Sequence, residues 1–255
     1  MTAPPSRPES IAGRLRDEIL SGLYRAGDRL PAERDLAARL EVNRASVREA
    51  LRILEQLGLV SIRPGDGARV RHVQEASLDL VRHLLFRDGK VNLPAAVQVL
   101  DVYEMLVSGA ARLAVERGSD DELLHARELL TKLGDGATAP EDWPGIIDQL
   151  FEVMTAASEN LVVRLCRNAI GAALASDLGH SFWKLVRPSA DTIREEARAI
   201  DRAVVARDPV ATEEAVRAMI RERRIRLLAA LEDPDFKSAP QFDATRLTSQ
   251  EGYPA

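Results

Sequence analysis

Apolar residues recur at helical spacing through the first 58 residues and then alternate with polar ones. Isoleucine or leucine stands at positions 11, 15, 19 and 23, after Ser10 as the expected N-cap of a first helix. A second helix is predicted to begin at Pro31, and a third follows the break EVNRA and ends at Gly58. Residues 59–73 alternate between apolar and polar on both sides of PGDG, which is typical of a β-hairpin. Three helices followed by a hairpin predict a winged helix-turn-helix.

From residue 77 onward the apolar spacing is helical almost throughout. The predicted helices cover residues 77–87, 93–117, 120–133, 141–158, 160–186, 189–207 and 209–231, and no segment among them predicts a β-strand. The expected fold is therefore mainly α, with an N-terminal winged helix-turn-helix domain, its small β-hairpin wing, and an all-α C-terminal helical bundle. The expected boundaries are 1–76 for the first domain, 77–92 for a linker with a helix, and 93–232 for the bundle. Residues 1–9 and the aperiodic tail 233–255 are expected to be disordered.

The composition supports this reading and narrows the class of protein. Aromatic residues make up only 4% of the chain, which favours helices over a β-sandwich or barrel. The single cysteine, Cys166, cannot form an internal disulfide, and the N-terminus has no apolar segment typical of a secretion signal. No window reaches the roughly 18 apolar residues that a membrane span needs. We therefore expect a soluble cytoplasmic protein.

Charge is distributed unevenly along the chain. Residues 1–75 carry 13 arginines and 11 acidic residues, a net charge of +2, whereas the whole chain has a net charge of -5. Residues 76–255 therefore carry -7. A basic N-terminal part on an acidic body indicates two domains with different partners.

Three arginines lie four residues apart on the third predicted helix, at positions 44, 48 and 52. On an isolated helix such a row is usually a solvated face. Here the first turn holds Asn43, Arg44, Ala45 and Ser46, whose side chains suit entry into a DNA major groove. The wing adds Arg63, Arg69 and Arg71, and its two glycines permit close approach to a DNA backbone. We therefore interpret the third helix as a DNA-recognition helix.

The segment GDRLPAERDLAARLEVNRASVREALRILEQLGLVSIRPGDGARV, residues 27–70, resembles the DNA-binding domain of the GntR family of bacterial transcription regulators. The helical region behind it resembles the ligand domain of the FadR subfamily. The resemblance implies a homodimer, a repressor for example, that binds a palindromic double-stranded DNA operator and responds to a small-molecule effector. It implies that the DNA-contacting residues are Arg34, Asn43, Arg44, Ala45, Ser46 and Arg48, with Gly65 and Gly67 in the wing. Where the fatty-acid regulator FadR has a base-reading histidine in the wing, this chain has Pro64.

The commoner ligand domain of this subfamily binds a divalent metal through one aspartate and three histidines. Asp148 matches the aspartate, but Glu152, Ala197 and Glu222 stand at the three histidine positions. Because imidazole is the usual ligand for zinc or nickel, its loss argues against that metal site, and we expect no cofactor. A remnant of Asp148, Glu152 and Glu222 holding a harder cation stays an alternative. The four histidines, at positions 72, 83, 125 and 180, fall outside the pattern and are expected to be surface or packing residues.

The effector pocket is expected to be apolar. Near the places where the family tends to have an arginine and a glutamate, this chain has Tyr103 and Val107. The remaining candidates are apolar, namely Met105, Val153, Met154, Leu165, Phe182 and Trp183. A cavity without metal or arginine suits a long apolar ligand. The resemblance to the fatty-acid regulator FadR, which lacks the metal site and binds long-chain acyl-CoA, implies a fatty acyl-CoA or a related lipid-like acid as the effector. The predicted pocket residues are Tyr103, Val107, Asp148, Glu152, Phe182, Trp183 and Glu222.

Two other functions stay open from the sequence. One is a GntR-type regulator of small-carboxylate metabolism whose degenerate pocket binds no metal. The other is an enzyme built on the helical domain, but no nucleophile–base arrangement, phosphate-binding glycine loop or metal-ligand spacing supports it. We therefore expect a protein that is not an enzyme.

Overall fold

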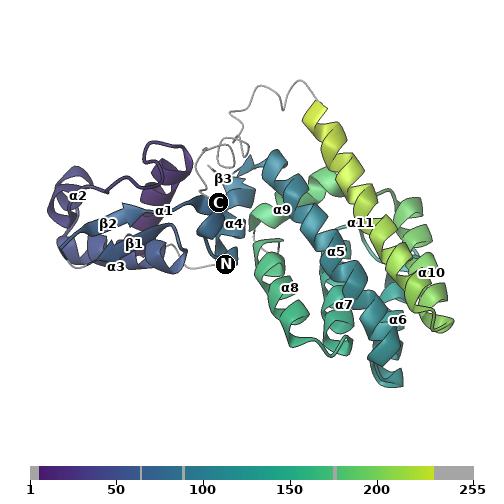
Figure 1. Cartoon of the computed structure of the whole chain (residues 1–255). Coiled ribbons are helices and arrows are strands. Elements are labelled where there is room, and N and C mark those ends of the chain that lie inside the picture. Colours follow the sequence, from purple (N-terminus) through teal and green to yellow (C-terminus); the bar gives the residue numbers. More distant parts are fainter. Residues whose placement is uncertain (1–5, 64, 88–89, 175–176, 233–255) are drawn as a thin grey trace. The chain divides into compact units, whose positions relative to one another are not determined.

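The computed structural model describes residues 6–63, 65–87, 90–174 and 177–232. They form two compact units, one that ends at Leu80 and one that begins at Val81 (Figure 1). This division falls inside the predicted linker 77–92. The first unit is a helix-turn-helix with a two-stranded hairpin and the second is a bundle of helices, which confirms the predicted fold class. The tail 233–255, predicted to be disordered, lies outside the described residues.

The first helix, α1 (Arg7–Leu20), begins earlier than predicted. Its N-cap is Ser6, whose hydroxyl accepts a hydrogen bond from the Glu9 N–H, while the Glu9 carboxylate accepts one from the Ser6 N–H. This reciprocal pair satisfies two backbone donors at once, which explains why it prevails over Ser10. Residues 7–9, which were expected to be disordered, are therefore helical. Leu23 lies beyond the helix end and is 62% exposed, so its predicted place on the buried face was wrong.

Two short helices follow and form the helix-turn-helix. They are α2 (Glu33–Arg39) and α3 (Arg44–Gln56). Leu36 of α2 and Leu54 of α3 are fully buried, as is Leu15 of α1. Arg39 ties α2 to α1, because its Nη2 lies 2.7 Å from the Glu18 carboxylate. The apolar stripe of α3 therefore faces this core and leaves its other side exposed.

The wing consists of β1 (Val60–Arg63) and β2 (Gly67–Val70), paired antiparallel with Val60 opposite Val70. The loop before α2 lies beside β2, where the Leu30 N–H donates to the Ala68 carbonyl at 2.9 Å. A 3-10 turn, η1 (Val73–Glu75), and another, η2 (Leu78–Leu80), complete the first unit. The wing is thus joined to the helix-turn-helix by backbone hydrogen bonds.

The second unit is built from helices. They are α4 (Val81–Leu85), α5 (Leu93–Arg117), α6 (Asp120–Gly134), α7 (Trp143–Ala157), α8 (Leu161–Leu174), α9 (Asp177–Val186), α10 (Ala190–Val205) and α11 (Pro209–Glu232). Over residues 160–186, predicted as one helix, the structure describes α8 and α9, and residues 175–176 between them lie outside the described residues. The prediction of no strand was wrong, since β3 (Phe86–Arg87) pairs with β4 (Lys90–Val91). Each strand has only two residues, too short to show an alternating pattern.

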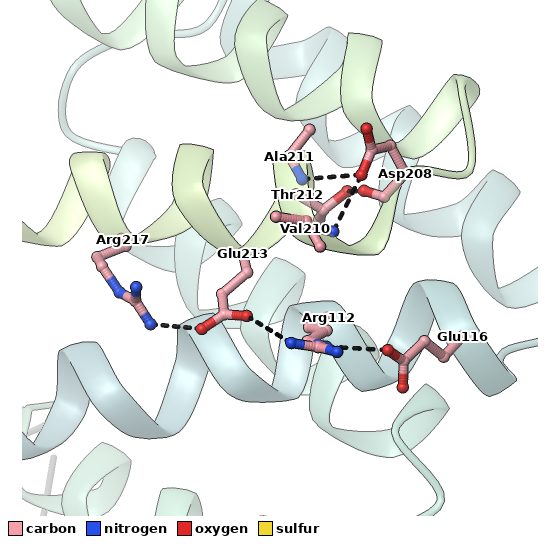
Figure 2. A network of polar contacts seen from close by, with 8 residues as sticks. All are labelled: Arg112, Glu116, Asp208, Val210, Ala211, Thr212, Glu213 and Arg217. Carbon is pink, nitrogen blue, oxygen red and sulfur yellow. Dashed lines mark hydrogen bonds and ion pairs between the residues drawn. The ribbon is translucent and has the colours of Figure 1, made fainter.

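The long helices α5 and α11 lie side by side and antiparallel (Figures 1 and 2). Arg112 of α5 bonds to Glu116 at 2.9 Å and contacts Glu213 of α11 at 3.5 Å, and Arg217 continues the chain of ion pairs from Glu213. The Asp208 carboxylate caps α11 by accepting hydrogen bonds from the next free backbone N–H groups, a role suited to this residue type. Apolar side chains of α5, α6, α7, α10 and α11 share one continuous core behind this face.

The hydropathy of the described helices was compared with that of membrane-spanning helices. Among the described residues, no helix combines the length and apolar character needed to cross a bilayer.

Candidate functional site

The N-terminal edge of α3 is an exposed polar surface. Asn43 is the N-cap, and its side-chain oxygen accepts a hydrogen bond of 2.7 Å from the Ser46 N–H. This bond fixes the amide at the helix start and leaves its N–H groups as donors. Arg44 and Ala45 follow, both exposed. Arg44 has no polar side-chain partner in the described part of the chain, so no described carboxylate neutralises its guanidinium.

The other arginines of this surface are held by carboxylates. Both nitrogens of one edge of the Arg48 guanidinium bond to Glu33 of α2, at 3.0 and 3.3 Å, and this bond raises the pKa of Arg48. Arg52 bonds to Glu49 at 2.8 Å within α3. Arg34, exposed on α2, lies 3.3 Å from the Asp35 carboxylate. The structure therefore brings α2 and the start of α3 into one surface on which Arg44 differs from its neighbours.

The wing has a glycine turn and one unpaired arginine. Gly65 and Gly67 have positive φ angles of 81° and 76°, which glycine adopts without steric cost. Arg69 bonds to Asp66 and, at 2.8 Å, to the Gly27 carbonyl. Arg71 bonds to Glu75 at 2.9 Å, whereas Arg63 is exposed and has no polar side-chain partner in the described segments. Pro64, which replaces the wing histidine, lies outside the described residues.

A cavity of about 280 Å³ lies among α5, α7, α9 and α11. Its apolar wall includes Leu100, Ile147, Phe151, Val186, Met219 and Ile220. Four of the predicted pocket residues line it, namely Tyr103, Asp148, Phe182 and Trp183. The other three, Val107, Glu152 and Glu222, are not part of the lining. The cavity is thus a mainly apolar chamber with a few polar groups, as ligand sites usually are.

The periodicity of α11 explains the misplaced Glu222. The inward stripe of this helix is formed by the buried residues Val216, Met219, Ile220, Arg223 and Leu227. Glu222 lies off that stripe and pairs with Arg226 at 2.9 Å. Residue 223, not 222, is therefore the α11 position that faces the cavity. In the sequence, an arginine within an otherwise apolar stripe could have indicated that residue 223 faces the cavity.

The residues do not fit the metal that the family resemblance implies. Glu152 is exposed, Ala197 has no ligating atom, and Glu222 is not part of the cavity lining and pairs with Arg226. The carboxylate of Asp148 is bound by Arg167 instead. Within the described ranges, no group of three or more His, Cys, Asp or Glu residues is placed to hold a metal ion. The structure therefore does not gather the predicted carboxylate remnant into a cation site.

The expectation of a cavity without arginine was wrong. Arg223 lines the cavity with a side chain that is only 4% exposed. Both terminal nitrogens bond to the two carboxylate oxygens of Glu196 on α10, each at 2.6 Å. Burial raises the pKa of Glu196, while the bonds from Arg223 oppose that shift. Arg223 and Glu196 thus form a buried ion pair in the wall.

A second buried arginine, Arg167, is bonded to Asp148, which lines the same cavity. The Arg167 side chain on α8 is 7% exposed, and its Nη2 donates to the Asp148 main-chain oxygen at 2.8 Å and to the Asp148 carboxylate. Burial raises the pKa of Asp148, with Arg167 acting against it. Burial also raises the pKa of Tyr103, so this hydroxyl stays neutral and can only donate or accept hydrogen bonds. The Tyr103 ring lies edge-on to Phe151, with centroids 5.9 Å apart.

A winged helix-turn-helix with an exposed N-terminal edge, followed by a helical unit with an internal cavity, defines a transcription regulator of the helix-turn-helix class. Residues 8–70 match the family model described as bacterial regulatory proteins, gntR family, and residues 98–222 match the FCD domain. The chain belongs to the GntR family and carries an FCD domain as its second unit.

Relatives of known sequence agree with this assignment along almost the whole chain. An uncharacterized HTH-type transcriptional regulator of Mycobacterium tuberculosis, Rv0494, is 32% identical over 90% of this chain and 94% of its own length. The HTH-type transcriptional regulator Mce2R of the same species is 29% identical, over 89% of this chain and 93% of its own. The solved structure of Lar, which controls the expression of the Listeria monocytogenes agr system, has a TM-score of 0.55 and 18% identity, over 89% of this chain and 99% of Lar. That structure supports the fold alone.

Proposed function

We propose that the chain is a ligand-responsive transcription regulator, a repressor for example, that binds a palindromic operator as a homodimer. The edge of α3 from Asn43 to Arg48 enters the major groove, and Arg34 and the glycines of the wing approach the DNA backbone. Two copies place their recognition helices in successive turns of the groove, roughly 34 Å apart, so the symmetry of the protein selects a palindrome. Membership of the FadR subfamily stays part of this proposal.

The proposal rests mainly on one observation, that Arg44 is exposed and has no carboxylate partner among the described residues. Arg44 lies in the first turn of α3, where recognition helices read bases, and it is the exposed arginine of that helix that no carboxylate neutralises among the described residues. An arginine that bonds to both acceptors of a guanine edge is the commonest base-specific contact. The N-cap bond of Asn43 holds the helix start in place, so less order has to be gained on binding.

The effector binds in the cavity of the second unit. A ligand that prefers one arrangement of the DNA-binding units shifts the population toward it and so changes the affinity for DNA. The sequence favours a fatty acyl-CoA or a related lipid-like acid. The cavity volume of about 280 Å³ lies just below the roughly 300–1,000 Å³ of common ligand pockets and favours a short acyl group. The alternative is a small carboxylate bound without metal.

Substitution of Arg44 tests the DNA-binding edge. Arg44→Ala is expected to weaken binding to duplex DNA from upstream of the chain's own gene by roughly 5- to 150-fold, equivalent to about 1–3 kcal/mol, and to relax base preference at one position. Electrophoretic mobility shifts with the intact chain measure both effects. Arg52→Ala on the same helix is the matched control, because Arg52 is already paired with Glu49.

The two variants give a clear contrast. The proposal predicts that Arg52→Ala retains affinity within about threefold of the parent chain, since exposed ion pairs contribute little. Equal losses in both variants would show that the edge contributes charge alone, without base reading. Unchanged binding in Arg44→Ala would refute the assignment of α3 as the recognition helix.

A further inference from the structure

The cavity contains a hydrogen-bond donor that the described residues leave unsatisfied. Trp183 of α9 lines the cavity, and its indole Nε1 is buried without an acceptor among the described residues. The other tryptophan, Trp143, donates its Nε1–H to the Thr138 carbonyl at 3.2 Å. A buried donor without an acceptor is costly, and native proteins rarely keep one without a reason. A ligand acceptor at Trp183 supplies that reason.

The charged groups that line the cavity are already compensated by the protein. Arg223 has both terminal nitrogens on Glu196, and Asp148 is bound by Arg167. The other lining residues of the described chain are uncharged. Two guanidinium groups and two carboxylates cancel, so the wall carries no net charge.

This balance disfavours a free carboxylate as the ligand. A carboxylate entering the cavity loses its hydration and meets no cation that is free to replace it. It also lies beside the Asp148 carboxylate, to which the Arg167 Nη2 is bonded, and the terminal nitrogens of Arg223 are on Glu196. Drawing Arg223 away from Glu196 would leave a buried carboxylate without its partner, which is strongly unfavourable.

The rest of the wall suits an apolar body of modest size. Leucine, isoleucine, valine, methionine and phenylalanine side chains form most of the lining, and the volume is about 280 Å³. Apolar surface buried against these side chains supplies the main driving force for binding. The indole N–H then orients the ligand through one hydrogen bond.

We propose that the effector is an uncharged molecule with a short apolar body and one carbonyl oxygen, as in an ester, thioester or ketone. The carbonyl accepts the hydrogen bond of Trp183 Nε1, and the apolar part fills the space between α5, α7 and α11. This inference rests on the proposed function, since it specifies which class of ligand the FCD domain binds. The paired arginines hold the wall together and do not recognise the ligand.

The test uses two probes that differ mainly in charge, methyl hexanoate and hexanoate. The intact chain is labelled with ¹⁵N at the indole nitrogens, which gives one signal for each of its two tryptophans. The Trp143→Phe variant assigns the two signals. Methyl hexanoate is expected to move the Trp183 N–H signal downfield and to saturate, while Trp143 stays unmoved as an internal reference. Hexanoate is expected to need at least about tenfold higher concentration for the same occupancy.

A pair of matched variants measures the hydrogen bond itself by calorimetry. Trp183→Phe keeps an aromatic ring and removes the N–H, so the affinity for methyl hexanoate is expected to fall roughly 2- to 10-fold. Trp143→Phe is the control, because its N–H is already bonded to Thr138 and Trp143 is not part of the lining. The comparison of methyl hexanoate with hexanoate uses the unaltered chain, so it remains valid even if a variant fails to fold.

Three results would overturn the proposal. They are absence of ester binding, equal or tighter binding of hexanoate, and saturation by the ester with an unmoved Trp183 signal. Equal ester affinity in Trp183→Phe and the unaltered chain would also reject the hydrogen bond. The experiment contains no DNA, so its failure is separate from a failure of the Arg44 mobility-shift test.

Discussion

Arg223 shows how one residue determines the character of the cavity. It lies in the inward stripe of α11 among apolar neighbours, and only the carboxylate of Glu196 makes its burial tolerable. Moving a charge out of water is costly, and a bidentate partner offsets that cost without turning the pair into a large source of stability. The pair therefore contributes mainly by fixing α10 against α11 beside the cavity.

Replacing one or both members of this pair tests that role. Arg223→Met is expected to lower the free energy of unfolding by about 3–5 kcal/mol, because Glu196 is left buried without its partner. Glu196→Met combined with Arg223→Met is expected to recover most of that loss, since two apolar side chains replace two charges. Urea unfolding followed by circular dichroism measures both variants. A double variant as unstable as Arg223→Met would show that the ion pair is itself a major source of stability.

From the sequence, several residues that line the cavity could be identified, but the direction in which each helical side chain points could not. Tyr103, Asp148, Phe182 and Trp183 were found from motif and composition. Glu222 was assigned by counting from a family pattern, and an error of one residue on a helix turns a side chain by about 100°. The buried pairing of Arg223 depends on α10, which is distant in sequence, so no local pattern could reveal it.

At the scale of elements, the ends of helices decide how the first unit holds together. Gly58 follows the C-cap of α3 with a φ of 74°, and Gly22 follows the C-cap of α1 with a φ of 81°. A Cβ at residue 58 would lie 3.0 Å from the Ala76 Cα and from the Glu75 carbonyl oxygen. At residue 22 it would meet nothing within 4 Å. The two glycines therefore share a backbone conformation but differ in packing.

Alanine at these two positions separates backbone strain from close packing. Gly22→Ala is expected to cost about 1–2 kcal/mol, the usual cost of a left-handed conformation for a residue with a Cβ. Gly58→Ala is expected to cost at least about 1 kcal/mol more, because rigid backbone atoms block its Cβ. Thermal unfolding by circular dichroism measures the difference. Equal costs at the two sites would contradict the packing of residues 75–77 against the end of α3.

Long periodic elements were predictable, and short or interrupted ones were not. The helices α5, α6, α10 and α11 lie where the apolar spacing placed them. Over residues 160–186 the apolar spacing predicted one helix, whereas the structure describes α8 and α9 on either side of residues 175–176, which lie outside the described chain. The β3–β4 pair escaped because two residues per strand leave no alternation to detect. The start of α1 was missed because a capping box prevailed over a single serine.

At the scale of the whole molecule, two units carry two different binding chemistries. The first has an exposed polar edge with Arg44, an arginine that no described carboxylate neutralises, and this edge suits a polyanion. The second has a charge-balanced, mainly apolar cavity, which suits a small uncharged ligand. Coupling between them must be reciprocal, so a ligand that weakens DNA binding by some factor is itself bound more weakly by that factor in the presence of DNA.

The central claim is that the N-terminal edge of α3 binds duplex DNA, and amide hydrogen exchange on the intact chain tests it most directly. Exchange is measured with and without duplex DNA from upstream of the chain's own gene, with a scrambled duplex of equal length as control. The account predicts slower exchange in residues 43–48 and in strands β1 and β2 with the upstream duplex, and a smaller effect with the scrambled one. Unchanged exchange in residues 43–48 under conditions where the DNA is bound would contradict it.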